Sequence, residues 1–312
     1  MAGNRCRKRA TPAGAPVMVE VTFMEPFEYI KPSSPAEASA ILAAEGSAAR
    51  ILQGGTDLII RMRGDFIHPK IVVDLKGLPG MRDVAFNPDD GLILGAAVTM
   101  NEVATHPAIL AHYRMLADAC ETVGSYQLRN RATIGGNVCN ASPAGDSIPA
   151  LLCYDATAVI YNPAGERRLP LFDFFRGPGK TDLKPGEFLQ ALELPASPAG
   201  AVGIYNKLGR TKVGDIAVIG VGVLGWPQRS NPSGSAWRIA LASVGPTPLL
   251  APTAEALLAQ ETDDLAVDAA AAAVMNACRP IDDVRASGAY RQAMVRVLAR
   301  RAIEGVLAHL PF

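Results

Sequence analysis

Two pairs of adjacent glycines constrain this chain more than any other feature of its sequence. Gly135 and Gly136 stand between small polar residues, and a Ser-Pro-Ala-Gly-Asp turn that ends at Asp146 follows them closely. Segment 51–58, Ile-Leu-Gln-Gly-Gly-Thr-Asp-Leu, carries the second pair and has the same character. Because glycine has no side chain, successive backbone N–H groups in such segments can point into one concavity and hold an anion.

Each glycine pair taken alone is compatible with an ordinary tight turn. Each pair nevertheless lies beside a threonine and precedes an aspartate, and together they favour a shared phosphate-bearing ligand. Asp146 has two interpretations: it caps the helix that follows, or it accepts hydrogen bonds from sugar or ribityl hydroxyls. Neither segment fits a Walker loop or a dinucleotide fingerprint.

The pair at 54–55 joins a predicted strand directly to a predicted helix. Residues 50–53 are expected to form the strand, and Thr56 and Asp57 are expected to open a helix over 58–62. The free N–H groups and the positive dipole end of that helix would face the turn. A strand that runs into a helix through Gly-Gly is typical of an anion site.

Charge and cysteine content narrow the class of protein. Lysine plus arginine number 30 and aspartate plus glutamate number 30, so we expect neither nucleic acid nor an acidic membrane surface as a partner. The odd, scattered cysteines contain no C-x-x-C pair, which argues against a disulfide framework and against a zinc or iron–sulfur site on this chain. They indicate a reducing cytoplasm. These cysteines are Cys6, Cys120, Cys139, Cys153 and Cys278.

The order of the predicted elements indicates an α+β chain. Expected strands cover 71–75, 92–95, a hairpin over 156–161 and 167–170, 187–194, 202–208, 216–224 and 237–244. Expected helices cover 34–45, a stretch from 99 to about 122 that His106-Pro107 interrupts, a short segment after 146, and then 253–259, 264–278 and 287–307. The Pro/Gly/Ser cluster at 195–200 is the expected boundary between lobes.

Three further features have simpler interpretations than a binding site. Residues 220–225 match G-x-G-x-x-G, but they lie in an apolar strand that leads into a loop, so the pattern lacks the context of a nicotinamide site. The cations of segment 205–215 are typical of a solvated basic loop. The last helix is expected to bury a stripe that includes Met294 and Ile303 and to leave Arg291 outside it.

Four segments, taken together, resemble a known family. They are 53–57 (Gln-Gly-Gly-Thr-Asp), 133–146 with its Thr-Ile-Gly-Gly-Asn and Ala-Ser-Pro-Ala-Gly-Asp motifs, 207–217, and 283–291 (Asp-Val-Arg-Ala-Ser-Gly-Ala-Tyr-Arg). In order and spacing they resemble the FAD-binding medium subunit of the molybdenum hydroxylases, the family of bacterial xanthine, carbon monoxide and nicotinate dehydrogenases. The resemblance extends from about residue 19 to residue 306.

The resemblance implies a fold of the vanillyl-alcohol-oxidase (PCMH-like) type. Two α+β lobes would clasp FAD, and a C-terminal α+β lobe with a small antiparallel sheet and helices would cover the flavin region. The implied division is a disordered basic tail over 1–17, FAD-binding subdomains over 18–78 and 79–195, and a C-terminal flavoprotein lobe over 200–308.

The resemblance also implies the residues that hold FAD. The pyrophosphate would rest on the two glycine segments, Asp146 would hold polar groups of the cofactor, and Lys207 would lie near the N1/O2 edge of the flavin. At Val123 the sequence departs from xanthine dehydrogenase, which has an aromatic flavin contact there. The implied set is Ile51, Leu52, Gln53, Gly54, Gly55, Thr56, Asp57, Leu58, Val123, Thr133, Ile134, Gly135, Gly136, Asn137, Asp146, Leu189 and Lys207.

As a member of such a family, the chain would transfer electrons and would carry no catalytic residue or metal ligand of its own. A large subunit with a molybdopterin cofactor would hydroxylate the substrate, and a small subunit with two [2Fe-2S] clusters would pass electrons to FAD and then to NAD+ or another acceptor. The expected assembly is a dimer of heterotrimers in the cytoplasm. Two alternatives stay open: a self-contained flavin oxidoreductase of the same superfamily, and a non-catalytic nucleotide-binding or assembly protein.

Overall fold

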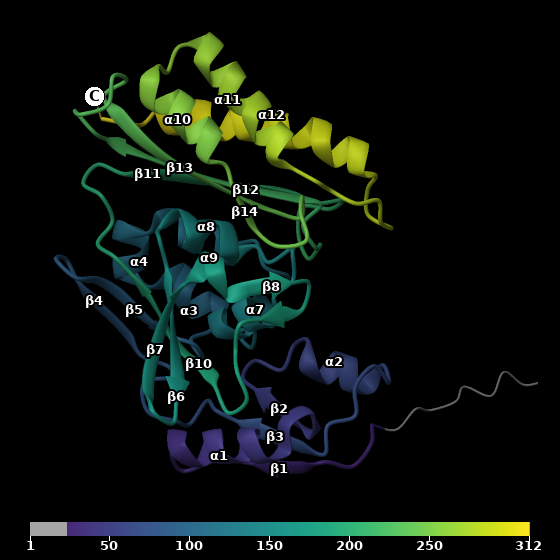
Figure 1. Ribbon diagram of the computed structural model, residues 1–312. Coiled ribbons are helices and arrows are strands. Elements are labelled where there is room, and N and C mark those ends of the chain that lie inside the picture. Colours follow the sequence, from purple (N-terminus) through teal and green to yellow (C-terminus); the bar gives the residue numbers. More distant parts are fainter. Residues whose placement is uncertain (1–23, 312) are drawn as a thin grey trace, which may run out of the picture.

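The computed structural model describes residues 24–311, which form three main sheets in succession, one two-stranded hairpin and their helices. Figure 1 shows the sheets in chain order, from the purple N-terminal unit to the green sheet beneath the C-terminal helices. The mixture of helices and sheets confirms the predicted α+β class. The predicted disordered tail over 1–17 lies outside the described residues.

The first sheet is parallel and has the strand order β1-β3-β2. It comprises β1 (Glu28–Ile30), α1 (Pro35–Glu45), the short 3-10 turn Gly46–Ala48, β2 (Ala49–Leu52), α2 (Leu58–Arg63) and β3 (Ile71–Asp74). Helix α1 begins where the sequence predicts, because Ser34 accepts a hydrogen bond from the amide of Glu37 and Pro35 occupies the first turn. The turn between β2 and α2 brings Gly54 and Gly55 to one end of this sheet.

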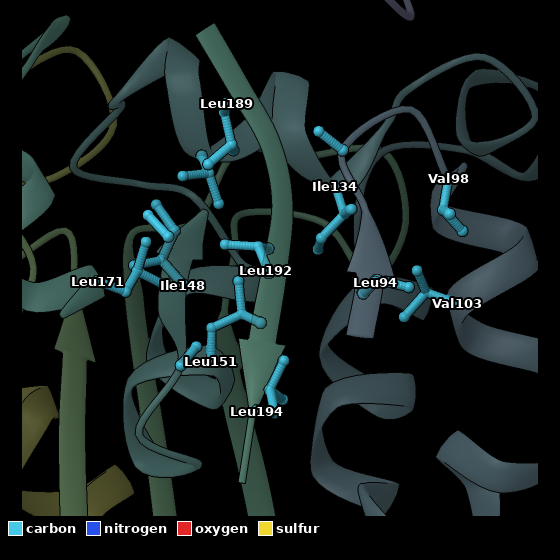
Figure 2. Close-up of a cluster of buried hydrophobic side chains, with 14 of the residues drawn as sticks. Leu94, Val98, Val103, Ile134, Ile148, Leu151, Leu171, Leu189, Leu192 and Leu194 are labelled. Atoms are coloured by element: carbon cyan, nitrogen blue, oxygen red, sulfur yellow. The ribbon is translucent and has the colours of Figure 1, made fainter. Parts of the chain in front are cut away.

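The second sheet is antiparallel and has the order β4-β5-β10-β6-β7. Helices α7 and α9 contact it, and Figure 2 shows Leu192 and Leu194 of β10 among apolar side chains such as Ile148 and Leu151 of α8. The elements are β4 (Val84–Asn87), β5 (Gly91–Gly95), α3 (Met100–Thr105), α4 (Pro107–His112), α5 (Arg114–Glu121), α6 (Tyr126–Arg129), α7 (Ile134–Asn140), α8 (Ser147–Cys153), β6 (Thr157–Asn162), β7 (Gly165–Pro170), α9 (Leu171–Phe174), the hairpin β8 (Phe175–Gly177) and β9 (Lys180–Thr181), and β10 (Phe188–Leu194).

The third sheet is antiparallel and lies between two layers of helices. One face packs on α10 to α12 and the other on α8 and α5. Because both faces are covered, β12 is buried over its first seven residues. The elements are β11 (Val202–Leu208), β12 (Ile219–Pro227), β13 (Ser235–Ala242), β14 (Leu249–Leu250), α10 (Pro252–Gln260), α11 (Asp264–Ala277) and α12 (Gly288–Leu307).

The glycines of the G-x-G-x-x-G pattern lie inside β12, as the sequence predicts. Each permits a close contact that a side chain would block. A Cβ at Gly222 would lie 3.2 Å from Pro149 of α8, and a Cβ at Gly220 would lie 2.6 Å from the hydroxyl of Tyr205. Gly222 therefore serves the packing of the third sheet on the second unit, and Gly220 serves packing within the third sheet.

Most of the predicted elements are confirmed, including the capping box of Thr99 and Glu102 and the break at His106-Pro107. The sequence did not predict β1 or β4, which are three- and four-residue strands with no fully buried position. The strand expected from residue 216 begins at Ile219, and residues 214–216 lie in the loop before it and line a cavity. No helix among the described residues has the length and apolar character needed to cross a membrane.

The prediction that Arg291 lies outside the apolar stripe of α12 is wrong. Its side chain is only 2% exposed, while Tyr290 beside it is 49% exposed. The guanidinium donates to the carbonyl oxygens of Val218 and Ser243 at 2.7 and 3.1 Å, and to Asp283 at 2.6 Å. A buried arginine is tolerated here because these acceptors replace its hydration.

We predict that Arg291→Met lowers the free energy of unfolding by about 3 kcal/mol, since it leaves buried carbonyl groups without a donor. Arg296→Met on the same helix is the matched control, because Arg296 is 43% exposed and pairs with an equally accessible Asp268. That control should cost at most about 1 kcal/mol. Urea denaturation measures both, and equal losses would contradict the role assigned to Arg291.

Candidate cofactor site

Residues of both glycine segments line one cavity of about 570 Å³. Its volume falls within the range of roughly 300–1,000 Å³ that is usual for sites of small molecules and cofactors. The wall comes from all three sheet units: residues 49–61 of the first, residues 123–146 and 183–189 of the second, and residues 214–216 of the third. The cavity therefore exists only where the three units meet.

The first wall is the turn between β2 and α2. Gly55 has a φ of +76°, a backbone conformation that favours glycine. Among residues 24–311, none accepts a hydrogen bond from the five successive amides of residues 54–58. These amides are free to bind an anion, as expected of a strand that enters a helix through Gly-Gly. The side chain of Asp57 does not cap α2 but accepts from Asn140 at 3.4 Å.

The second wall differs from the predicted glycine turn, because Gly135 and Gly136 lie in the first turn of α7. Thr133 caps this helix by accepting from the amide of Gly136 at 3.1 Å. The amides of Ile134 and Gly135 donate to the carbonyl oxygens of Val98 and Ala96, both at 2.9 Å. These two amides are consequently occupied by the protein itself, unlike those of the first wall.

Gly54 and Gly135 each permit a close backbone contact, Gly54 between the first and second units and Gly135 within the second unit. A Cβ at Gly54 would collide with the carbonyl oxygen of Arg131, and one at Gly135 would lie 2.5 Å from the carbonyl oxygen of Ala96. A side chain at Gly135 would therefore strike the protein backbone and not the ligand space, contrary to the simplest interpretation of the motif. The close approach lets Thr133 donate from its hydroxyl to Gln53 Oε1 at 3.2 Å.

Asp146 connects the second wall to the third sheet. Its carboxylate accepts from the hydroxyl of Tyr205 and from the amine of Lys207, both at 2.8 Å, and its side chain does not cap α8. Burial raises the pKa of Asp146, and the neighbouring Lys207 opposes this shift. Burial and the adjacent Asp146 raise the pKa of Tyr205, so its hydroxyl remains a hydrogen-bond donor.

Lys207 lies behind the cavity wall. Its amine, 12% exposed, donates to Asp146 and to the carbonyl oxygen of Thr122 at 2.9 Å. Thr122 precedes Val123, which lines the cavity. Lys207 therefore holds two parts of the wall. Cys139 also lines the cavity, but burial raises the pKa of its thiol to about 12, which keeps it protonated and unreactive.

Of the site residues predicted from the sequence, thirteen line this cavity and four lie behind it. Those outside the lining are Leu52, Ile134, Gly135 and Lys207. Direct contact with a cofactor stays a prediction for all of the site residues. Those on the wall are Ile51, Gln53, Gly54, Gly55, Thr56, Asp57, Leu58, Val123, Thr133, Gly136, Asn137, Asp146 and Leu189.

Sequence reasoning did not place the third wall, which consists of Gly214, Asp215 and Ile216. The surrounding cations favoured a solvated loop. Arg210 is 58% exposed, as expected of such a loop, but it pairs at 3.2 Å with Asp215, whose side chain is only 9% exposed. Ile216, however, is 59% exposed although it is apolar, and it lies at the cavity. The signal in the sequence was segment 207–217, which carries part of the family resemblance, but these three residues were not assigned to the site.

Comparison with known proteins identifies the family of this chain. The family described as the FAD binding domain in molybdopterin dehydrogenase matches residues 25–197, which is more than half of the chain. The family described as the CO dehydrogenase flavoprotein C-terminal domain matches residues 204–306. The chain belongs to the FAD-binding flavoproteins of the molybdopterin dehydrogenases. The sequence-based resemblance is thereby confirmed, with FAD as the cofactor and an oxidoreductase flavoprotein subunit as the kind of protein.

Curated relatives and solved structures agree with this family. The carbon monoxide dehydrogenase medium chain of Hydrogenophaga pseudoflava is 33% identical over 90% of this chain and 97% of its own length. A putative xanthine dehydrogenase FAD-binding subunit of Escherichia coli is 29% identical over 86% and 91%. A solved carbon monoxide dehydrogenase from Hydrogenophaga pseudoflava aligns with a TM-score of 0.88 at 33% identity, covering 93% of this chain and 100% of that chain.

We predict that Gly54→Ala prevents stable retention of FAD, because its Cβ would collide with Arg131 and push the first two walls apart. Overpacking of this kind costs about 1–3 kcal/mol of stability. Gly77→Ala is the control, since a Cβ there would meet no atom within 4 Å. The ratio of flavin absorbance to protein after purification measures the effect. Equal flavin content in the two variants would show that the close approach of the walls is dispensable.

Proposed function

We propose that the chain is the electron-transfer subunit of a molybdenum hydroxylase complex, which passes electrons from [2Fe-2S] clusters of a partner subunit through FAD to NAD+ or another acceptor. The observation that carries this proposal is the cavity, where five successive amides with no acceptor among residues 24–311 lie beside an apolar wall. The relatives are described as a medium chain and as an FAD-binding subunit, and the chain spans nearly their whole length.

The residues that line the cavity fit FAD. The amides of residues 54–58 would hold the pyrophosphate, and Arg50 and Arg61 place two cations on the same part of the wall. Gln53 and Thr133 would fix the junction of the walls beneath it. Asp146, Gly136 and Asn137 would face polar groups of the cofactor, as the family resemblance implies.

The apolar part of the wall suits a flavin ring. Val123, Phe188 and Leu189 come from the second unit, and Ile216 comes from the third. When bound, FAD supplies the capacity to accept electrons in one- or two-electron steps, while the protein supplies position and electrostatics. The aliphatic side chains would exclude water from the ring, and the aliphatic Val123 leaves that contact without aromatic stacking.

The wider assembly follows from the same proposal. A small [2Fe-2S] subunit and a large molybdopterin-binding subunit would be the partners, as a dimer of heterotrimers in the cytoplasm. The division into subdomains 18–78 and 79–195 and a C-terminal lobe 200–308 also stays a proposal; it is supported by the three sheets, whose strands fall within these ranges.

We predict that the full chain, affinity-purified from its own cells, brings with it chains that contain iron and molybdenum, and that the isolated chain contains neither metal. Elemental analysis and mass spectrometry measure this. After anaerobic reduction of the iron-containing partner, mixing with the FAD-loaded chain should bleach the flavin. The FAD-depleted chain is the control, because it should form the complex without the absorbance change.

Two outcomes would replace the proposal by an alternative. Steady turnover of a small substrate by the isolated FAD-loaded chain would identify a self-contained oxidoreductase. A chain that is colourless and does not bind added FAD would identify a non-catalytic nucleotide-binding or assembly protein.

A further inference from the structure

Ser243 joins three segments of the chain just beyond the end of β13. Its amide donates to the carbonyl oxygen of Pro143 at 2.7 Å, and its hydroxyl donates to the carbonyl oxygen of Ala217 at 3.0 Å. Its own carbonyl oxygen accepts from Arg291 at 3.1 Å. Ser243 is 9% exposed, and its backbone has a φ of +65°, which residues other than glycine seldom adopt. A strained residue of this kind persists only when its surroundings fix it.

The carbonyl oxygen of Ala217 has a second donor. Arg285 Nη1 reaches it at 3.1 Å. Asp283 anchors this arginine with a carboxylate oxygen at 2.5 Å, and its other oxygen accepts from Arg291 at 2.6 Å. Bonds from these two arginines lower the pKa of Asp283, so the carboxylate stays ionised and keeps both guanidinium groups in place. Two donors from distant parts of the third unit thus converge on one buried carbonyl group.

Both segments that Ser243 contacts continue into the cavity wall. Ala217 directly follows Gly214, Asp215 and Ile216, which form the third wall. Pro143 lies in the turn 141–146, where Ser142, Ala144, Gly145 and Asp146 line the second wall. The cluster of Ser243, Asp283, Arg285 and Arg291 therefore stands behind the line along which these two walls meet, without lining the cavity itself.

We propose that Ser243 and Arg285 are positioning residues for the FAD site, which hold the wall loop 214–217 against the turn 141–146 through the shared carbonyl group of Ala217. This inference rests on the proposed function of the cavity. It assigns a role to the segment 283–291, which contacts no part of the cavity. Ile216 is accessible and apolar, so its own side chain does not fix the loop at the cavity by burial.

The test is a double-mutant cycle on the affinity of the full-length apoprotein for FAD. Ser243→Gly removes only the hydroxyl donor, because glycine accepts the left-handed backbone and keeps the amide and carbonyl bonds. Arg285→Met removes the second donor, while Asp283 keeps Arg291. We expect each single variant to bind FAD about threefold more weakly, and the double variant about thirtyfold or more, since loss of both donors leaves a buried carbonyl unsatisfied.

The circular dichroism of bound flavin in the visible region is a second measurement. A substitution that lowers only the stability of the fold would leave it unchanged. It should change in both single variants and most in the double variant. Ser230→Gly with Arg296→Met is the matched control, because both residues are exposed or partly exposed and lie away from the cavity.

A double variant whose FAD affinity and flavin spectrum match the wild type overturns the proposal, even if its unfolding midpoint falls. If the double variant does not fold, Ser243→Gly alone decides by the same two measurements. A wild-type chain that binds no FAD overturns the proposed function and this inference with it, and that result is distinguishable because it does not depend on any substitution.

Discussion

The site depends on the direct contact of Gly54 with the backbone at Arg131. At this point two units meet with no side chain between them, so the bond between Thr133 and Gln53 can form across the junction. The same contact brings the amides of residues 54–58 in the first unit, which have no acceptor among residues 24–311, to the cavity that the first turn of α7 in the second unit also lines. A single methyl group at position 54 would separate these groups, and for this reason the glycine is a requirement of assembly as much as of ligand binding.

A buried carboxylate extends this arrangement to the third unit. Asp146 belongs to the second wall, and its partners Tyr205 and Lys207 belong to β11. Taking a carboxylate and an amine out of water is costly, and such a pair contributes little net stability compared with apolar packing. The pair instead fixes the geometry of the wall, because Lys207 also donates to the carbonyl oxygen of Thr122 beside the cavity. Polar contacts at the junctions therefore set the shape of a site whose fold is stabilised by two apolar cores.

The sequence was sufficient to predict elements whose signals are local. Helix α1 has its cap and proline, α3 has its capping box, and β12 has an apolar run that excluded a nucleotide-binding interpretation of its glycines. The two glycine segments were also correctly associated, because both line one cavity. Family resemblance then identified the cofactor, which local physical chemistry had narrowed only to a phosphate-bearing ligand.

What the sequence did not predict depends on contacts between distant segments. A Cβ at Gly135 would meet the backbone of Ala96, and Arg291 is buried because carbonyl oxygens 73 and 48 residues away accept hydrogen bonds from it. No periodicity in α12 contains that information. The third wall was missed for the same reason, since the loop 214–216 reaches the cavity only through the packing of the third sheet.

A crystal structure of the full chain with bound FAD would test the central claim most directly. We predict that the pyrophosphate oxygens lie about 2.7–3.2 Å from amides of residues 54–58, with Ile134 and Gly135 still bonded to Val98 and Ala96. Phosphates bound instead by the amides of Ile134 and Gly135, with α7 displaced from Ala96, would contradict the account.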